Sequence, residues 1–315
     1  MYNSKIPYRQ LTAWLSAALI PTALQLTAGA SWLSVLLVSA LCLLCIWLRW
    51  NFGTELRGKI AVLLQLGLLL LVLGTAAQVS IQSWPRGGHP AVAIMLLVLA
   101  VWSAWKGPSA AARVGCVLFW FVLIFYLVLL GAGIKDVSPR WLIPTGGKVD
   151  AFGCVLLLTP TIAVIHANKK ESFKPRLLLV GLFCTVAAAV TAGALSPQVA
   201  SGKQNAFYEM TRSLNLLGHA RRFEAVLSAG MTVGWFCVFS LNLTLCARLV
   251  EDFVPGRGKW GALGAAVSAV AMLLCDLHIP GIFLLVMCAI FWVLVPILTQ
   301  WIERIKKSKK SENSA

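Results

Sequence analysis

Charge is scarce in this sequence, and negative charge is the scarcest. Only 12% of the 315 residues are charged, against roughly 25% in an average globular protein. Lys and Arg number 27 and Asp and Glu only 11, while hydrophobic residues make up 59% of the chain. A soluble fold of this size has no interior large enough to hide that much apolar surface. The composition therefore excludes an ordinary soluble protein and predicts an integral membrane protein.

The sequence also lacks the motifs of catalysis and of metal binding. It contains no HExxH, no GxSxG and no phosphate-binding glycine loop. The nine cysteines all fall inside apolar runs, and so does their one CxxC pair, Cys42 and Cys45. Cysteines in such surroundings pack as small hydrophobic side chains. We therefore expect no enzyme activity, no metal site and no cofactor.

Long apolar runs dominate the rest of the chain. A membrane-spanning helix needs roughly 20 mostly apolar residues. By this measure we predict an all-α protein with a single polytopic domain over residues 1–305, followed by a basic, disordered cytoplasmic tail over 306–315. The ten predicted spans cover residues 10–29, 31–48, 60–83, 90–105, 111–134, 150–167, 176–196, 222–247, 260–276 and 280–302.

The basic residues give these spans a direction. If residue 1 is cytoplasmic, 19 of the 27 Lys and Arg residues fall on the cytoplasmic side and eight on the outer side. Short cytoplasmic loops carry such an excess of positive charge. We therefore expect both chain termini in the cytoplasm. The same placement favours membrane lipid as a partner and argues against nucleic acid.

Two prolines stand at matching places in the two halves of the chain. Pro21 lies about halfway along the first span of residues 10–134, and Pro160 about halfway along the first span of residues 150–302. Interrupted helices at corresponding positions are the best sequence indication of a transporter built from an inverted repeat. Five spans in each half would give the two halves opposite orientations.

Proline removes a helical hydrogen bond and leaves a carbonyl oxygen free. Inside a membrane such a group needs a partner, which a bound polar ligand such as an amino acid can supply. Two ordinary proline kinks are the alternative interpretation. The candidate ligand-binding residues are Pro21, Thr22, Ala23, Gln25, Thr159, Pro160 and Thr161.

Three further polar residues inside predicted spans are candidates for ion coupling or gating. Glu224 lies one turn into the eighth span, where a carboxylate is costly and therefore a functional candidate. Gln65 and Asn242 are the most central uncharged polar residues. The alternatives are an ion pair of Glu224 with Arg221, and interhelical hydrogen bonds for Gln65 and Asn242.

The segment from residue 196 to residue 222 is too polar to span the membrane. Within it, Phe207, Met210, Leu214 and Leu217 recur at helical spacing. We predict a short amphipathic helix on the outer face of the protein. It is either an interfacial connector or a lid over an outward-facing site.

Four short stretches resemble the spore germination permease family, which supplies the B subunit of endospore germinant receptors. They are residues 207–212 (FYEMTR), 222–225 (RFEA), 6–11 (IPYRQL) and 32–37 (WLSVLL). The first two are similar to the family's F/Y-E-x-x-R stretch and to the R-x-E-A that opens its eighth helix. The other two resemble the family's segments before the first helix and at the start of the second.

The resemblance implies the fold of the amino acid/polyamine/organocation superfamily. That fold is LeuT-like, with ten core helices in a five-plus-five inverted repeat and with helices 1 and 6 broken around the ligand. The resemblance also implies a protein of the spore inner membrane, or of the cell membrane, that binds a small germinant such as an amino acid. Its expected partners are the A-type and C-type receptor subunits.

One departure from the family pattern leaves alternatives open. The family's glycine-rich break in helix 1 is replaced here by Pro21-Thr22-Ala23-Leu24. A genuine proton- or cation-coupled amino-acid transporter is one alternative to the receptor subunit. A structural receptor subunit with a vestigial pocket is the other.

Overall fold

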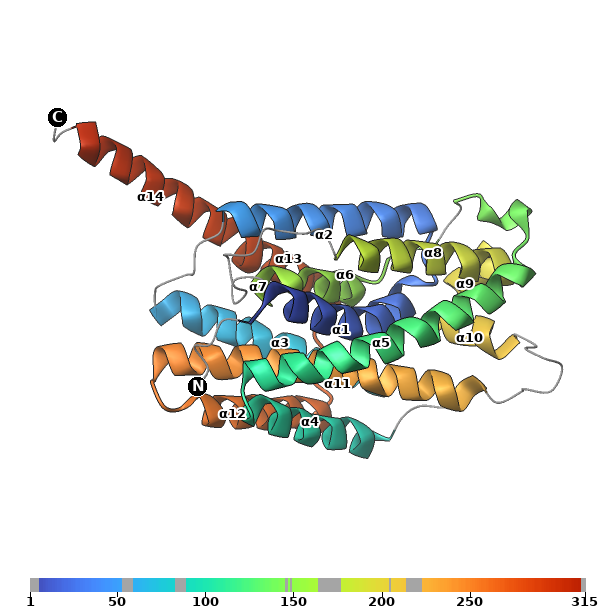
Figure 1. The fold of residues 1–315 in the computed structure, drawn as a ribbon, viewed down its shortest axis with the longest axis horizontal. Helices are drawn as coiled ribbons and strands as arrows, with labels where there is room; N and C mark the ends of the chain where they lie inside the picture. Colours follow the sequence, from blue (N-terminus) through green and yellow to red (C-terminus); the bar gives the residue numbers. More distant parts are fainter. Residues whose placement is uncertain are drawn as a thin grey trace.

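The computed structural model describes residues 6–52, 59–82, 89–144, 147, 149–163, 177–203, 205–213 and 223–312. Every secondary-structure element of three or more residues within these ranges is a helix, as Figure 1 shows. Of the residues in α11 and α14, the side chains of 223–226, 303–304 and 306–312 lie outside the description.

Fourteen α-helices follow one another along the described chain. Three short helices of other types accompany them: the 3-10 helices η1 (Ile134–Asp136) and η2 (Pro139–Leu142), and the π-helix η5 (Ala289–Leu294) between the last two α-helices. The α-helices are α1 (Tyr8–Thr27), α2 (Trp32–Phe52), α3 (Lys59–Gln82), α4 (Pro90–Trp105), α5 (Pro108–Gly133), α6 (Ala151–Leu158), α7 (Pro160–Ala163), α8 (Leu178–Leu195), α9 (Pro197–Ser201), α10 (Ala206–Ser213), α11 (Phe223–Phe253), α12 (Gly258–Leu274), α13 (Gly281–Cys288) and α14 (Val295–Glu312).

Six helical segments are long and apolar enough to cross a membrane. They are Trp32–Phe52, Lys59–Gln82, Pro108–Asp136, Leu178–Leu195, Leu227–Phe253 and Gly281–Ile302. Three shorter apolar helices, Pro90–Trp105, Ala151–Ala163 and Gly258–Leu274, fall at three further predicted spans. This architecture supports the prediction of an integral membrane protein.

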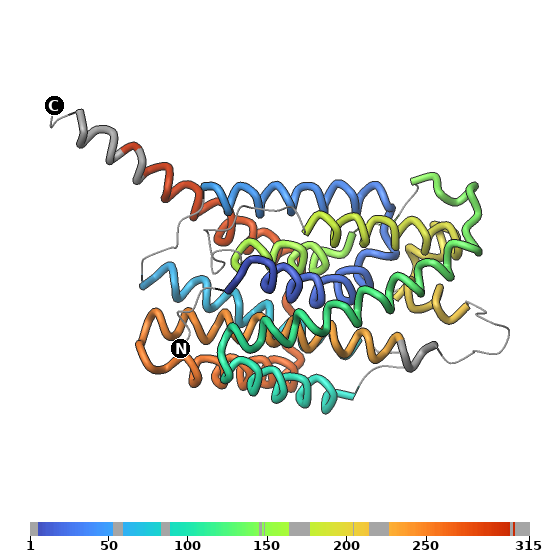
Figure 2. Tube along the Cα trace, in the orientation of Figure 1, coloured from blue at the N-terminus to red at the C-terminus, as the bar shows by residue number. Residues whose placement is uncertain are grey.

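Helix α1 lies at the centre of the bundle. It packs against α5, α11, α8 and α6, and Figure 2 shows its trace enclosed by these segments. Sixteen of its 20 residues are buried. A helix with protein on all sides has no lipid-facing stripe, so it can carry hydroxyl groups around its circumference. Those hydroxyls bond to the carbonyl one turn back, as Ser16 Oγ does to Thr12 O (2.8 Å) and Thr27 Oγ1 to Ala23 O (2.7 Å).

The last helix corrects one expectation. We predicted a disordered tail over 306–315, but α14 continues to Glu312. Figure 1 shows α14 leaving the bundle near the end at which α1 begins. The physical reason is local, because this segment is rich in Lys, which is a good helix former.

Glycine lets α5 approach α1 closely. A Cβ atom added at Gly115 of α5 would collide with the indole ring of Trp14. A Cβ atom added at Gly131, in the same helix, would meet nothing within 4 Å. Small residues at membrane helix interfaces allow this kind of backbone approach.

The variant Gly115→Ala is therefore expected to lower the melting temperature of the detergent-solubilised protein. The added methyl group overpacks a fully enclosed contact, at a cost of about 1–3 kcal/mol. The matched control is Gly131→Ala in the same helix, which should leave the melting temperature unchanged or slightly raised. Equal melting temperatures for the two variants would contradict the tight contact between α1 and α5.

Candidate functional site

The sixth predicted span is divided into two helical segments where the sequence analysis placed a break, but the helical path continues across the division. Helix α6 ends at Leu158, Thr159 forms a turn, and α7 begins at Pro160. Proline is well suited to the first position of a helix, because its missing N–H group would be unpaired there in any case. The interruption is slight, because Thr159 keeps helical dihedral angles, its N–H donates to Val155 O at 3.1 Å and its carbonyl oxygen accepts from the N–H of Ala163 at 3.3 Å.

The first span does not break, so that part of the prediction is wrong. Helix α1 runs without interruption from Tyr8 to Thr27 with Pro21 inside it. A single proline removes one intrahelical hydrogen bond, and close packing on all sides holds the neighbouring turns in place. Thr22 reinforces the helix at this point, because its Oγ1 donates to Ala18 O at 2.6 Å.

The predicted ligand residues are buried, but the described contacts do not join those of α1 to those at the start of α7. All seven are buried: Pro21, Thr22, Ala23, Gln25, Thr159, Pro160 and Thr161. The three threonine hydroxyls donate their protons within their own helical segments, Thr159 to Val155 O (3.2 Å) and Thr161 to Leu158 O (2.7 Å) in addition to Thr22. Their remaining capacity is that of acceptors, which suits a donor group such as an ammonium ion.

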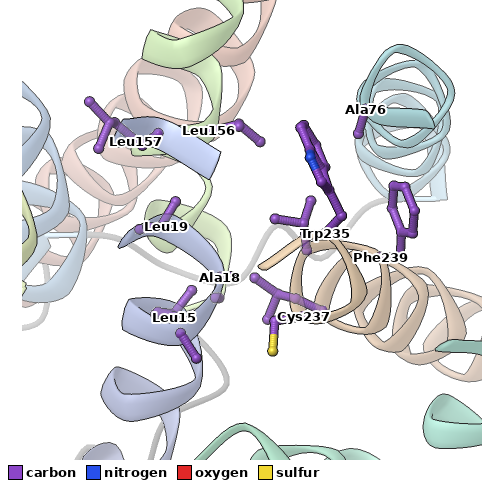
Figure 3. Close-up of a cluster of buried hydrophobic side chains, with 14 of the residues drawn as sticks. Leu15, Ala18, Leu19, Ala76, Leu156, Leu157, Trp235, Cys237 and Phe239 are labelled. Atoms are coloured by element: carbon purple, nitrogen blue, oxygen red, sulfur yellow. The ribbon is translucent and has the colours of Figure 1, made fainter. Parts of the chain in front are cut away.

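Helix α11 packs against α1 at Pro21. A Cβ atom added at Gly234 would lie 2.7 Å from both Cβ and Cγ of Pro21, so the proline ring sits directly on the glycine backbone. The next residue, Trp235, is completely buried, and its indole ring lies 6.1 Å from the ring of Phe239. Figure 3 shows Trp235 reaching between α6 and α3, with Leu156 on one side and Ala76 on the other.

Trp235 is the functional candidate that sequence reasoning missed. Its Nε1 has no hydrogen-bond partner among the described residues, although the side chain is 0% exposed. Buried indole N–H groups usually find a partner. The signal was present in the sequence, because this tryptophan lies inside an apolar span, whereas membrane-interface tryptophans lie at span ends.

The predicted short amphipathic helix is present as α10, and its place on the outer face stays a prediction. Its Phe207 and Met210 are buried, and the ring of Phe207 stacks on that of Tyr126 of α5 at 5.8 Å. Leu214 and Leu217 lie outside the described residues.

A hydrogen-bonded residue just before α10 connects it to α1 and α3. Asn205 Oδ1 accepts from Gln25 Nε2 at 2.7 Å, and Asn205 Nδ2 donates to Gln82 O at 3.3 Å. Helix α10 also packs against α1, α5, α8 and α11. It is therefore seated on the helices that surround the candidate site, at the end of the bundle where α3 ends.

The three candidate coupling residues differ in what the structure describes. Glu224 lies in the first turn of α11, but its side chain is outside the described part. Asn242 is fully buried, with Nδ2 donating to Val238 O at 2.9 Å within α11. Its Oδ1, like Nε2 of the buried Gln65, has no partner among the described residues. The coupling role of all three stays a prediction.

Comparison with known proteins identifies the fold. No protein-family model matches the chain, and no curated protein matches it. Among solved structures, the chain is similar to a nucleobase-cation-symport-1 family transporter in a closed conformation with bromovinylhydantoin bound. The TM-score is 0.61 at 13% sequence identity, over 91% of this chain and 77% of that chain. Identity at this level shows the fold alone, so the chain has a LeuT-like, transporter-type helical fold.

Proposed function

We propose that this chain is the membrane subunit of a spore germinant receptor, which binds a small nutrient such as an amino acid and helps to trigger germination. One observation carries the proposal. The residues of the family-like stretch 207–212 form α10, and α10 packs on α1, α5, α8 and α11. The stretch that resembles the germination permeases and the candidate ligand site therefore belong to one packed unit.

The helix packing supports a five-plus-five inverted repeat over residues 10–134 and 150–302. In such a repeat α1 corresponds to α6/α7, α2 to α8, α3 to α11, α4 to α12 and α5 to α13–α14. A two-fold axis between the two halves requires that each contact between two helices recurs between their counterparts. Helix α2 packs on its counterpart α8, α3 on α11, and α4 on α12. Helix α1 packs on α8, as α6 and α7 pack on α2, and α3 packs on α12, as α11 packs on α4.

The polar groups around the site favour a zwitterionic ligand. The hydroxyl oxygens of Thr22, Thr159 and Thr161 retain acceptor capacity, which complements an ammonium group. The indole N–H of Trp235 has no partner among the described residues and is a donor, which complements a carboxylate. An amino acid carries both of these charged groups on one carbon atom. The similar transporter also binds a small molecule in its closed conformation.

Sensing is favoured over transport by the contact between α1 and α11. Pro21 packs directly on Gly234, so that a Cβ atom at residue 234 would have no room. Helix α1 is continuous through this contact. Alternating access requires one helix group to rock against the other around the site. A close, rigid contact of this kind resists that motion. The likeness to a cation symporter supports coupled transport as the second candidate.

A structural subunit with a vestigial pocket is the third candidate. Figure 3 shows apolar side chains between α1, α6 and α11, including Leu19 and Leu156. Both are buried. Apolar filling of this kind favours a pocket that no longer binds a ligand.

Deleting the gene from its spore-forming host tests the proposed function directly. We expect spores of the deletion strain to lose the response to at least one amino acid, measured as the release of spore solutes against a panel of nutrients. Reintroducing the intact gene should restore the response. Unchanged germination with every nutrient would contradict the proposal.

The variant Trp235→Phe, reintroduced into that deletion strain, separates a working pocket from a vestigial one. Loss of one hydrogen bond to a charged ligand group costs about 1.5–3 kcal/mol, so the half-maximal germinant concentration should rise about tenfold or more. The matched control is Trp292→Phe on η5, since Trp292 is also buried with Nε1 unpartnered among the described residues. Identical responses for the two variants would favour the vestigial pocket.

Uptake into proteoliposomes separates sensing from transport. The purified chain should bind its germinant without accumulating it when a proton or sodium gradient is imposed. Gradient-driven accumulation would favour the transporter, and Glu224→Gln should then reduce the flux, because a carboxylate within a membrane span is the expected proton or cation carrier.

A further inference from the structure

A groove on the outside of the bundle has no part in the site described above. It lies between α4 and α12, which pack against each other, and its volume is about 470 Å³. Ligand pockets commonly have about 300–1,000 Å³. Every residue that lines the groove is hydrophobic. Its walls include Val98 and Trp102 of α4 and Val267 of α12, with exposed fractions of 64%, 63% and 61%.

The length of the groove fits one leaflet of a bilayer. On α4 it extends from Ile94 to Trp105, which is about 17 Å at about 1.5 Å per residue. Half of the hydrocarbon core measures about 15 Å, whereas a spanning helix needs about 30 Å. The groove is therefore long enough for the acyl chain of a lipid in one leaflet and too short for a partner's transmembrane helix.

Positive charge lies at one end of the groove. Lys106 Nζ is 5.1 Å from the centroid of the Trp102 ring, which places the amine at the mouth of the groove. Trp105 Nε1 donates to Lys259 O at 3.0 Å, so the start of α12 is held at the same end. The side chains of Lys106, Lys259 and Arg257 are all exposed.

The acidic residues near this end do not cancel that charge. Glu251 and Asp252 lie at the end of α11. The Glu251 carboxylate accepts the backbone N–H of Gly258 at 2.7 Å and of Gly256 at 3.1 Å, and so it is held by the loop before α12. Three cations against two carboxylates leave this end of the groove positive.

We propose that the groove binds an anionic phospholipid, with an acyl chain between α4 and α12 and the phosphate at Lys106 and Lys259. Indole rings prefer the depth of the headgroups, where Trp102 and Trp105 then lie. This end of the bundle is also the end at which α11 finishes, which the charge bias of the sequence predicts to be cytoplasmic. Anionic lipids are concentrated in that leaflet, and basic pockets between membrane helices bind their headgroups. The inference is independent of the proposed germinant function.

Native mass spectrometry of the purified full-length chain tests this site, with phosphatidylglycerol and phosphatidylcholine of identical acyl chains as probes. We expect the intact chain to bind phosphatidylglycerol more tightly. Each lysine contributes roughly fivefold to the affinity for an anionic surface, so the double variant Lys106→Ala and Lys259→Ala should weaken phosphatidylglycerol binding roughly 30-fold. The matched control, Lys135→Ala with Arg140→Ala, removes two exposed charges near η1 and η2 and should change nothing.

A second variant tests the acyl-chain part of the site. Val267→Trp fills the groove from an exposed position and should abolish the tight binding without unfolding the protein. Equal binding of the two lipids by the intact chain would overturn the proposal, as would equal effects of the two charge-removing pairs. Tight binding that survives Val267→Trp would place the lipid elsewhere. A dimer that phosphatidylglycerol does not dissociate and that Val267→Trp disrupts would show that a second copy occupies the groove.

Discussion

The enclosure of α1 by protein on every side is the constraint on which the rest of the structure depends. Away from water, each hydroxyl and each backbone carbonyl must find a partner within the protein. The serine and threonine side chains of α1 meet this requirement through their own helix. The helix can therefore be polar in sequence and still lie at the centre of a membrane bundle. Its neighbours α5 and α8, in contrast, expose large apolar side chains such as Ile124 and Leu179 on the outside of the bundle, whereas α6 and most of α11 are buried as α1 is.

The same constraint explains which predictions from sequence succeed. Long apolar spans such as Lys59–Gln82 and Pro108–Asp136 can be recognised by composition, because lipid exposure demands it. The slight irregularity before Pro160 and the amphipathic helix α10 could also be predicted, since each follows from a local property of the residues. The break at Pro21 could not be judged in this way. Whether a proline breaks a helix depends on what packs around it, and here Gly234 of a distant segment lies against the ring.

The features missing from the sequence-based account are those that need two segments far apart in the chain. The sequence marks Trp235 as a tryptophan inside a span, but its place beside Leu156 of α6 and Ala76 of α3 is visible only in the folded chain (Figure 3). The lipid groove requires the side-by-side packing of α4 and α12, which are more than 150 residues apart. The charge bias in the sequence predicts on which side of the membrane its cationic end lies. It contains no information on which helices meet there.

The contacts between α1 and the glycines of its neighbours constrain how this sequence can change over time. Trp14 fits because residue 115 has no side chain, and Pro21 fits because residue 234 has none. A larger residue at either glycine is tolerated only if the residue opposite becomes smaller. Positions 14 and 115, and positions 21 and 234, therefore have to vary as pairs among descendants of this protein, although the members of each pair are about 100 and 200 residues apart in the chain.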